Sequence, residues 1–328
     1  MLAGLLPKPD FRIDVAGVNI TALVRDRLLG LRVVDQEGFD ADTLNFEIDN
    51  RDQLVAIPPA EARLKLWLGL KGAPLTNMGS FVVSRRSGSY TPSRMMIDAE
   101  AAALTGAIRA PRTRAWTDVT LGDVVSTIAS VHGLQATVAA QVASIELGYV
   151  AQTAESDLHL LTRLSRQLAV TIKPVAGRLI AVPVGAPINA AGTRLPEPFI
   201  ALTNCGMADW GIDDREPFNS VEADWGNPDG GEVETVTVGS GTPVRRLRHT
   251  FATQGEAQRA AAAELRYANR EAYTMSLDLD GFYPSLFAGG RARLVGFKPE
   301  HNGVWEVRSV THSLSEALRT TAELRKAV

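Results

Sequence analysis

The densest group of side chains with catalytic potential is an acidic cluster in the second half of the chain. Asp213 and Asp214 are adjacent, and Glu216, Glu222 and Asp224 follow them. Closely spaced carboxylates can bind calcium or supply the acid and the base of a glycoside hydrolase. The spacing of an EF-hand loop is absent, however, and the sequence does not pair one acid with one base. We interpret the cluster as a solvated loop, with a metal-binding or catalytic role as the alternative.

Other chemically active residue types are scattered. The single cysteine, Cys205, has no neighbouring ligand residue, and the histidines form no His-x-x-x-His pair, which argues against a zinc site. Ser156 and His159 lie close together, but a helix N-cap explains the serine and an exposed helix face explains the histidine. The five histidines are His132, His159, His249, His301 and His312.

Phosphate-binding and hydrolase motifs are also missing. The chain contains no Gly-x-Ser-x-Gly, Walker or Rossmann pattern, and Gly289-Gly290 precedes a strand pattern rather than a helix. The tryptophans are spread along the chain, and we expect them to anchor the core or an interface rather than bind sugars. They are Trp67, Trp116, Trp210, Trp225 and Trp305. We therefore expect no catalytic residue, no metal site and no cofactor.

The composition is that of a globular protein without a nucleic-acid-binding field. The chain has 328 residues, of which 45% are hydrophobic and 22% charged, and its net charge is −3, whereas a nucleic-acid binder usually shows a basic surface. One cysteine excludes an internal disulfide and fits folding in a reducing cytoplasm. No stretch of 18 apolar residues and no signal-peptide pattern occur, so we expect neither a membrane span nor an export signal. Two short basic clusters are interpreted as solvated faces: Arg109, Arg112 and Arg114, and Arg245, Arg246 and Arg248.

The elements that would position these residues are mostly strands over the first hundred positions. Alternations of apolar and polar residues recur there at spacings of roughly ten residues, as in antiparallel barrels and sandwiches. They cover residues 11–15, 44–49, 64–68, 79–83 and 95–99. We expect a mainly β (α+β) fold in which residues 1–104 form a first β-barrel domain.

Helix signals divide the rest of the chain. Thr120-Leu121-Gly122-Asp123 forms a capping box, and a leucine stripe follows Ser156-Asp157, which together predict an α-rich insertion over residues 105–172. A strand and linker segment is expected at 173–205. A second capping box begins at Thr253 and predicts an Ala-rich helix over about 254–272. That helix would precede the last strands of a second β-barrel domain, residues 206–328.

One strand pattern occurs twice. Arg-Leu-Lys-Leu-Trp-Leu-Gly at 63–69 corresponds to Arg-Ala-Arg-Leu-Val-Gly-Phe at 291–297, and each is followed by Gly-x-aromatic-x-Val, at 79–83 and at 303–307. A strand led by arginine then begins at Arg94 in the first copy and at Arg319 in the second. The alternative is that any two β-meanders share this texture. The hypothesis is two related barrels, so that a cyclic trimer would place six similar modules around one axis.

Several segments, in order along the chain, resemble the phage late control D proteins, the hubs of contractile-tail baseplates in myophages and R-type bacteriocins. The resemblance is carried by residues 31–44, 116–125, 152–157, 160–164, 303–307 and 310–314. It implies a homotrimeric hub that adapts the sixfold tail tube to a threefold membrane-piercing spike. Because no needle repeats follow the second barrel, the spike is expected to be a separate polypeptide.

The resemblance also implies the setting of the protein. We expect assembly in the host bacterial cytoplasm and a place in the baseplate of a virion or of a headless tail-like particle. Expected partners are the tail tube or tube-initiator protein, the tape measure protein and the baseplate wedge proteins, with no specific nucleic acid. The alternative function is a carbohydrate-binding or glycan-hydrolysing tail protein that uses the acidic cluster and the tryptophans.

Overall fold

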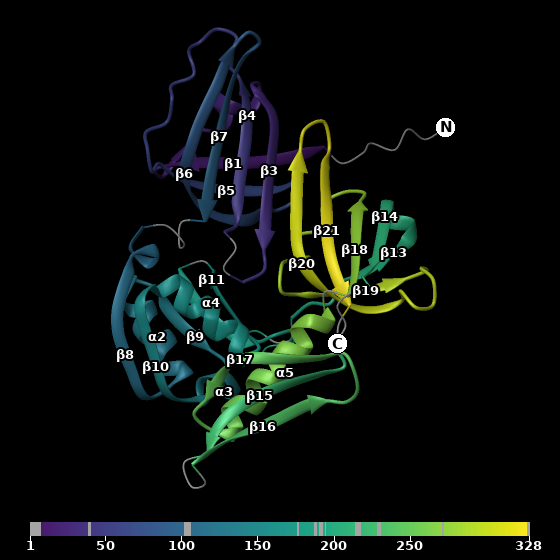
Figure 1. Ribbon diagram of the computed structural model, residues 1–328. Helices are drawn as coiled ribbons and strands as arrows, with labels where there is room; N and C mark the ends of the chain where they lie inside the picture. The colour runs from purple at the N-terminus through teal and green to yellow at the C-terminus, as the bar shows by residue number, and fades with distance from the viewer. Residues whose placement is uncertain are drawn as a thin grey trace.

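The computed structural model describes a mainly β protein with several helices (Figure 1). It describes residues 8–326, apart from 39–40, 102–105, 176, 187–188, 190–192, 194, 214–217, 228–230 and 271. None of the described helices is long and apolar enough to cross a membrane. The mainly β class predicted from the alternating patterns is confirmed.

A 13-stranded sheet, antiparallel in all but one of its strand pairs, forms the upper part of the molecule in Figure 1. Its first half consists of β1 (Pro9–Val15), β2 (Val18–Asn19), β3 (Leu28–Gln36), β4 (Thr43–Asp49), β5 (Arg63–Leu70), β6 (Thr76–Tyr90) and β7 (Ser93–Ala101). Its second half consists of β13 (Phe199–Ala201), β14 (Cys205–Ile212), β18 (Tyr273–Leu279), β19 (Arg291–Val295), β20 (Gly303–Leu314) and β21 (Leu318–Lys326). The short helix α1 (Thr21–Arg25) lies between β2 and β3.

The two halves are joined through a direct strand pair. Residues 309–314 of β20 pair with residues 31–36 of β3, so that both halves belong to one continuous sheet. Among the described strands, no ladder of hydrogen bonds closes either half into a barrel. Each half nevertheless has its own apolar core, one built mainly from β1–β7 and one from β13, β18, β19, β20 and β21.

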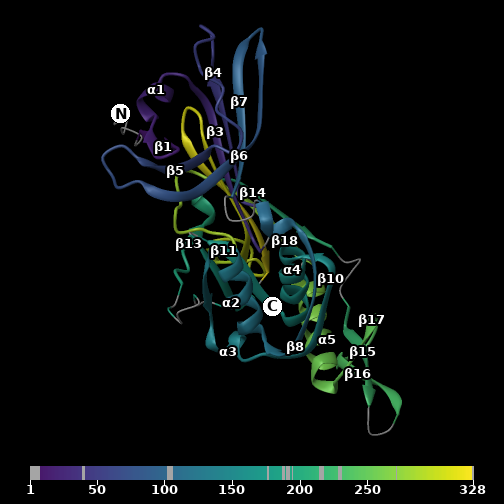
Figure 2. The ribbon, with the colours of Figure 1, turned by 90° about the vertical axis from the view of Figure 1, so that its left-hand side faces the viewer.

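A separate unit that contains helices lies below the large sheet in Figure 2. It contains β8 (Pro111–Thr120), α2 (Leu121–Val131), β9 (Gln135–Val138), α3 (Ala140–Ala143), β10 (Glu146–Ser156), α4 (Asp157–Leu168), β11 (Val170–Val175) and β12 (Arg178–Pro183), with η2 (Gly106–Arg109) at its start. Thr120 and Asp123 form the predicted capping box at α2. Strands β8 and β10 pair with each other, and β12 lies between β9 and β11. The unit is therefore richer in strands than the helix signals indicated, and β11 runs across the predicted segment border at residue 172.

A smaller unit consists of one sheet covered by the Ala-rich helix. The sheet contains β15 (Ser220–Asn227), β16 (Glu232–Gly239) and β17 (Val244–Phe251), and the helix is α5 (Gln254–Arg270). Ala257 and Ala261 of α5 are fully buried against Val221 and Ala223 of β15, because small side chains allow close approach of the helix. The predicted helix over about 254–272 is confirmed. The division of the chain into four segments stays a prediction.

The first core depends on strict alternation along β5. Leu64, Leu66 and Leu68 are at most 1% exposed, whereas Lys65 between them is exposed. We expect Leu66→Ala to lower the free energy of unfolding by about 3 kcal/mol, since it removes a buried side chain and leaves a cavity. Urea denaturation measures this loss. Lys65→Ala on the other face is the control, and a similar loss in both variants would contradict the assignment of faces.

Candidate functional site

The predicted acidic cluster is not assembled as one group among the described residues. Asp213 is exposed at the end of β14, whereas Glu222 and Asp224 lie on β15 in a different sheet. The remaining members, Asp214 and Glu216, lie outside the described residues. Hydrogen bonds from Thr235 and Arg246 lower the pKa of Asp224, which is thereby held as a paired carboxylate. Within the described part of the chain, no group of three or more His, Cys, Asp or Glu side chains could hold a metal ion.

The basic clusters are engaged in ion pairs with the chain itself. Arg109 pairs with Glu100 at 2.9 Å, Arg245 with Glu264 at 3.0 Å, and Arg246 with Asp224 at 2.8 Å. Arg245, Arg246 and Arg248 are exposed, as predicted for a solvated face. Arg112 and Arg114 instead turn towards a buried carboxylate, which the sequence interpretation did not anticipate.

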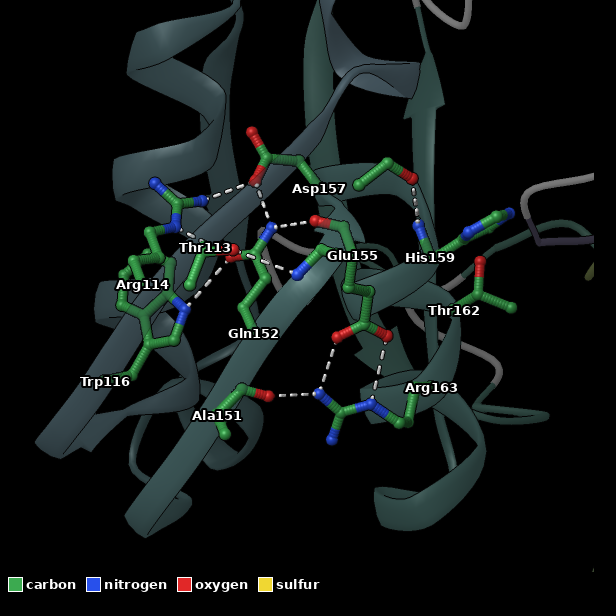
Figure 3. Close-up of polar contacts among 12 residues, drawn as sticks. Thr113, Arg114, Trp116, Ala151, Gln152, Glu155, Asp157, His159, Thr162 and Arg163 are labelled. Atoms are coloured by element: carbon green, nitrogen blue, oxygen red, sulfur yellow. Dashed lines mark hydrogen bonds and ion pairs between the residues drawn. The ribbon is translucent and has the colours of Figure 1, made fainter.

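That carboxylate is Asp157, at the first position of α4 and fully buried (Figure 3). It accepts hydrogen bonds from Arg114 at 2.5 Å and from Gln152 at 2.9 Å, and His132 Nε2 lies 2.8 Å away. Burial raises the pKa of Asp157, but the hydrogen bonds from Gln152 and His132 and the charges of Arg114 and Arg112 outweigh it and leave the pKa below its ordinary value. A buried carboxylate with this many partners fixes geometry rather than transferring protons.

The surrounding residues fix the orientation of Gln152. Its Oε1 accepts from Arg114 Nε at 2.7 Å and from Trp116 Nε1 at 3.3 Å, and its Nε2 donates to Asp157 and to the carbonyl of Glu155. The cluster therefore joins β8, β10 and the start of α4 (Figure 3). Ser156 accepts from the backbone N–H of His159 at 3.1 Å, and His159 is exposed, which confirms the predicted N-cap and exposed face.

A second buried ionic cluster connects the lower units to the large sheet. Arg270 at the end of α5 donates to Glu306 of β20 at 2.5 Å and to Glu37 at 3.3 Å, and Arg325 of β21 pairs with the same two carboxylates. Lys173 of β11 pairs with Asp35 of β3 and, at 3.0 Å, with Asp42. Burial lowers the pKa of Lys173, but the two carboxylates raise it more, so that the ammonium stays charged.

Four of the five tryptophans and Cys205 are buried or half-buried. Trp305 and Trp116 are buried, Trp67 and Trp225 are half-buried, and Trp210 is 51% exposed beside His301 and Lys298. Burial raises the pKa of the Cys205 thiol, with the charges of Asp280 and Asp278 adding to it, so a reactive thiolate is disfavoured. Core packing and ion pairing thus account for most of the described features that motivated a glycan-active alternative.

The repeated strand pattern occupies equivalent places in the sheet. β5, β6 and β7 form one antiparallel meander, and β19, β20 and β21 form another. Leu66 pairs with Gly79 in the first, and Leu294 with Gly303 in the second. The two glycines have φ values of 116° and 113°, which favour glycine in both places. A bulge follows Val83 in β6 and Val307 in β20. The pattern found in the sequence is therefore one geometry formed twice.

The repeat extends to further strands that the comparison of the two sequence copies did not include. β4 pairs with β7 and β3, and β18 pairs with β21 and β14, in the same directions and with a bulge at the same place in β3 and β14. The similarity that was missed is between residues 43–49, Thr-Leu-Asn-Phe-Glu-Ile-Asp, and residues 274–280, Thr-Met-Ser-Leu-Asp-Leu-Asp. We call β3–β4–β7–β6 the first module and β14–β18–β21–β20 the second.

The polar face of each module carries the same cross-strand pairs. Asn45 donates to Asp98 at 2.7 Å in the first module, and Ser276 donates to Glu323 at 2.7 Å in the second. An ion pair lies next to each of these contacts: Glu47 with Arg94 at 2.8 Å, and Asp278 with Arg319 at 3.8 Å. Since the pairs occur at equivalent register positions, the modules share surface chemistry as well as strand order.

His312 provides a pH test of the junction between the modules. It is 2% exposed on β20, and Thr320, whose hydroxyl donates to the Gly281 carbonyl, lies 3.0 Å from Nδ1. Burial lowers the pKa of His312 to about 4. The unfolded chain therefore binds this proton near pH 6.5 and the folded chain does not. The stabilising contribution is full above pH 6.5 and is lost as the pH falls towards 4.

We expect the neutral His312 to account for about 2 kcal/mol of the stability lost between pH 7 and pH 5. His312→Asn, which keeps a donor near the position of Nδ1, should lose correspondingly less in this window. Thermal or urea unfolding at both pH values measures the difference, with His159→Asn on the exposed face of α4 as the control. An equal loss in the wild type and His312→Asn would rule out the assignment.

No protein-family model matches the chain. The chain is 28% identical over 362 aligned positions to the "Probable baseplate hub protein" of Escherichia phage 186, covering 97% of this chain and 93% of that protein. It is 26% identical to the protein of the same description in Escherichia phage P2, covering 98% and 93%.

Solved structures show the same fold along nearly the whole chain. The 43 kDa tail protein of prophage MuSo2 from Shewanella oneidensis superposes with a TM-score of 0.71 at 12% identity, covering 97% of this chain and 98% of that one. A tail protein from Neisseria meningitidis gives 0.71 at 13% identity, covering 97% and 96%. A type VI secretion component of E. coli, itself structurally similar to the phage T4 tail proteins gp27 and gp5, gives 0.58 at 12% identity, covering 96% and 77%.

Proposed function

We propose that this chain, which belongs to the baseplate hub proteins of contractile phage tails, assembles into a homotrimer that adapts the sixfold tail tube to a threefold membrane-piercing spike. The hub role is structural rather than enzymatic, and its place is the baseplate of the phage virion. The trimer, the spike as a separate chain and the contacts with the tube, tape measure and wedge proteins are the proposed part.

The duplicated module is the observation that carries the proposal. Each chain contains two modules with one strand order, one register and the same cross-strand pairs. Three chains would therefore supply six similar units around an axis. Each half of the sheet, with its own core, would be one barrel-like unit of that ring. A sixfold tube can contact six similar units, while the differences between the two modules leave threefold symmetry for the spike.

The polar faces of the modules fit a role without chemistry. Their carboxylates and amides are engaged in pairs across the strands, which leaves a rigid, mixed-charge surface. Such a surface carries both signs of charge and lacks the uniformly basic field that binds nucleic-acid phosphates strongly. A ring lined in this way would suit passive passage of a tail's contents.

We expect the purified protein to form a trimer, with three times the 35.2 kDa mass of one chain. Light scattering coupled to size exclusion measures the mass, alone and with the spike protein added. Averaged images of the trimer viewed along its axis should show six similar lobes. A chain that stays monomeric at micromolar concentration in the presence of its spike would count against the proposal.

A further inference from the structure

We infer that neighbouring chains are joined by antiparallel strand pairing. Residues 85–90 of β6 in one chain pair with residues 208–213 in the next chain, which are the last part of β14 and the residue directly after it. The inference rests on the proposed homotrimer and deepens it by naming the interface and its register. Its occupant is a second copy of this chain.

The template is the junction between the modules inside one chain. There, the part of β20 that follows its bulge pairs with β21 on one side and with β3 on the other. Leu314 lies opposite Leu31, His312 opposite Val33, and Ser309 opposite Gln36. The first part of β20, before the bulge, pairs with β19 instead. One long strand thus completes its own module and also connects it to the next module.

In the first module, the strand equivalent to β20 is β6. Beyond its bulge, the side of β6 that corresponds to the β3-pairing side of β20 has no partner among the described strands. After its bulge β6 pairs with β7, and no described strand pairs with residues 84–90 on the side away from β7. β14, the equivalent of β3, pairs with β18 and ends the order of the large sheet, again with no described strand on its other side. In Figure 1, β6 and β14 lie at opposite sides of the sheet. Open strand edges of this length are strong sites for pairing with another chain.

The register follows from the equivalence of the modules. Val307 corresponds to Val83 and Ser309 to Arg85, because each pair flanks the same bulge. Leu31 pairs with Phe46 as Ala208 pairs with Leu277, so Leu31 corresponds to Ala208. The inferred opposite pairs between chains are Arg85 with Asp213, Arg86 with Ile212, Ser87 with Gly211, Gly88 with Trp210, Ser89 with Asp209, and Tyr90 with Ala208.

The side chains at these positions fit the inferred pairing. Tyr90 is 84% exposed and Trp210 is 51% exposed, yet their equivalents in the junction inside the chain, Leu314 and Val33, are only 4% and 3% exposed. The interface would therefore remove from water two aromatic residues that one chain leaves largely uncovered. On the opposite face the register brings Arg85 to Asp213, and opposite charges at facing positions stabilise antiparallel strands. Gly88, opposite Trp210, has no side chain that could clash with the indole.

The pairing is head to tail, because the β6 edge of one chain meets the β14 edge of the next. Each chain offers one β6 edge and one β14 edge, which are different surfaces, and such contacts either close into a ring or continue as a filament. If the junction between chains repeats the junction within the chain, one geometry recurs at every module. A ring of six modules, that is three chains, then has six equivalent strand pairings and none of these edges remains open.

Disulfide trapping tests the register. In a Cys205→Ser background, Ser89→Cys combined with Asp209→Cys places two thiols at directly opposite positions, where Cα atoms lie about 5 Å apart. We expect mild oxidation to convert this variant into a covalent trimer on a non-reducing gel. Each single variant should stay uncrosslinked. The matched control, Ser87→Cys with Asp209→Cys, is shifted by two residues on the same face and should crosslink weakly, since diagonal neighbours lie about 7–8 Å apart.

The outcomes separate this inference from the proposed function. A trimer by light scattering that does not crosslink at 89 and 209, or that crosslinks equally well in the shifted control, would overturn the inference and leave the trimer intact. A monomer would overturn both.

Charge exchange gives a second measurement that does not depend on oxidation. Arg85→Glu alone and Asp213→Lys alone should each weaken trimer formation, by about tenfold for three weak surface pairs. The combination should recover most of the loss, because the pair is restored with its charges exchanged. Loss without recovery would contradict the direct opposition of these residues.

Discussion

The pairing of β20 with β3 is the constraint on which the rest of the structure depends. It joins residues near the two ends of the chain, Leu314 and Leu31, and closing so long a loop costs entropy that only extensive burial can offset. The buried charges gather beside this junction. Asp35 of β3 holds Lys173 of the helical unit, and Glu37, just after β3, shares Arg270 and Arg325 with Glu306. Since buried charges are tolerated only with their partners present, both lower units depend on this junction for their position.

The cores beside the two modules use different side chains at equivalent positions. Leu64 faces Phe81 across β5 and β6, whereas Ala292 faces Trp305 across β19 and β20. A larger aromatic ring opposite a smaller aliphatic side chain partly compensates the difference in size, and cores accept such exchanges. The polar faces, by contrast, use nearly the same residue types at the same positions. The surface that a ring of modules would present therefore varies less within this chain than the interior that supports it.

The sequence predicted local features well because they depend on neighbouring residues. The capping box at Thr120, the Ala-rich helix and the repeated Gly-x-aromatic-x-Val pattern are all present in the structure, and at Thr253 the hydroxyl accepts from the backbone N–H of Glu256. Strand partners were harder to predict, since pairing joins distant segments that alternation alone does not match. Two barrels were expected from the repeat, but the β20–β3 pair that merges the halves has no local signature. The role of Arg114 at buried Asp157 was missed for the same reason, because 43 positions separate the two residues.

The positions of the inserted units give the proposed ring a direction. The helical unit leaves the sheet after β7, and the small sheet with α5 leaves it after β14. β14 corresponds to β3, and β3 and β7 each run antiparallel to β4, so both units depart from the same end of the modules, as Figures 1 and 2 show. The opposite end carries the β6–β7 and β20–β21 hairpins, one from each module. In a trimer the hairpin end would present six similar turns, and the other end would present units that occur once per chain.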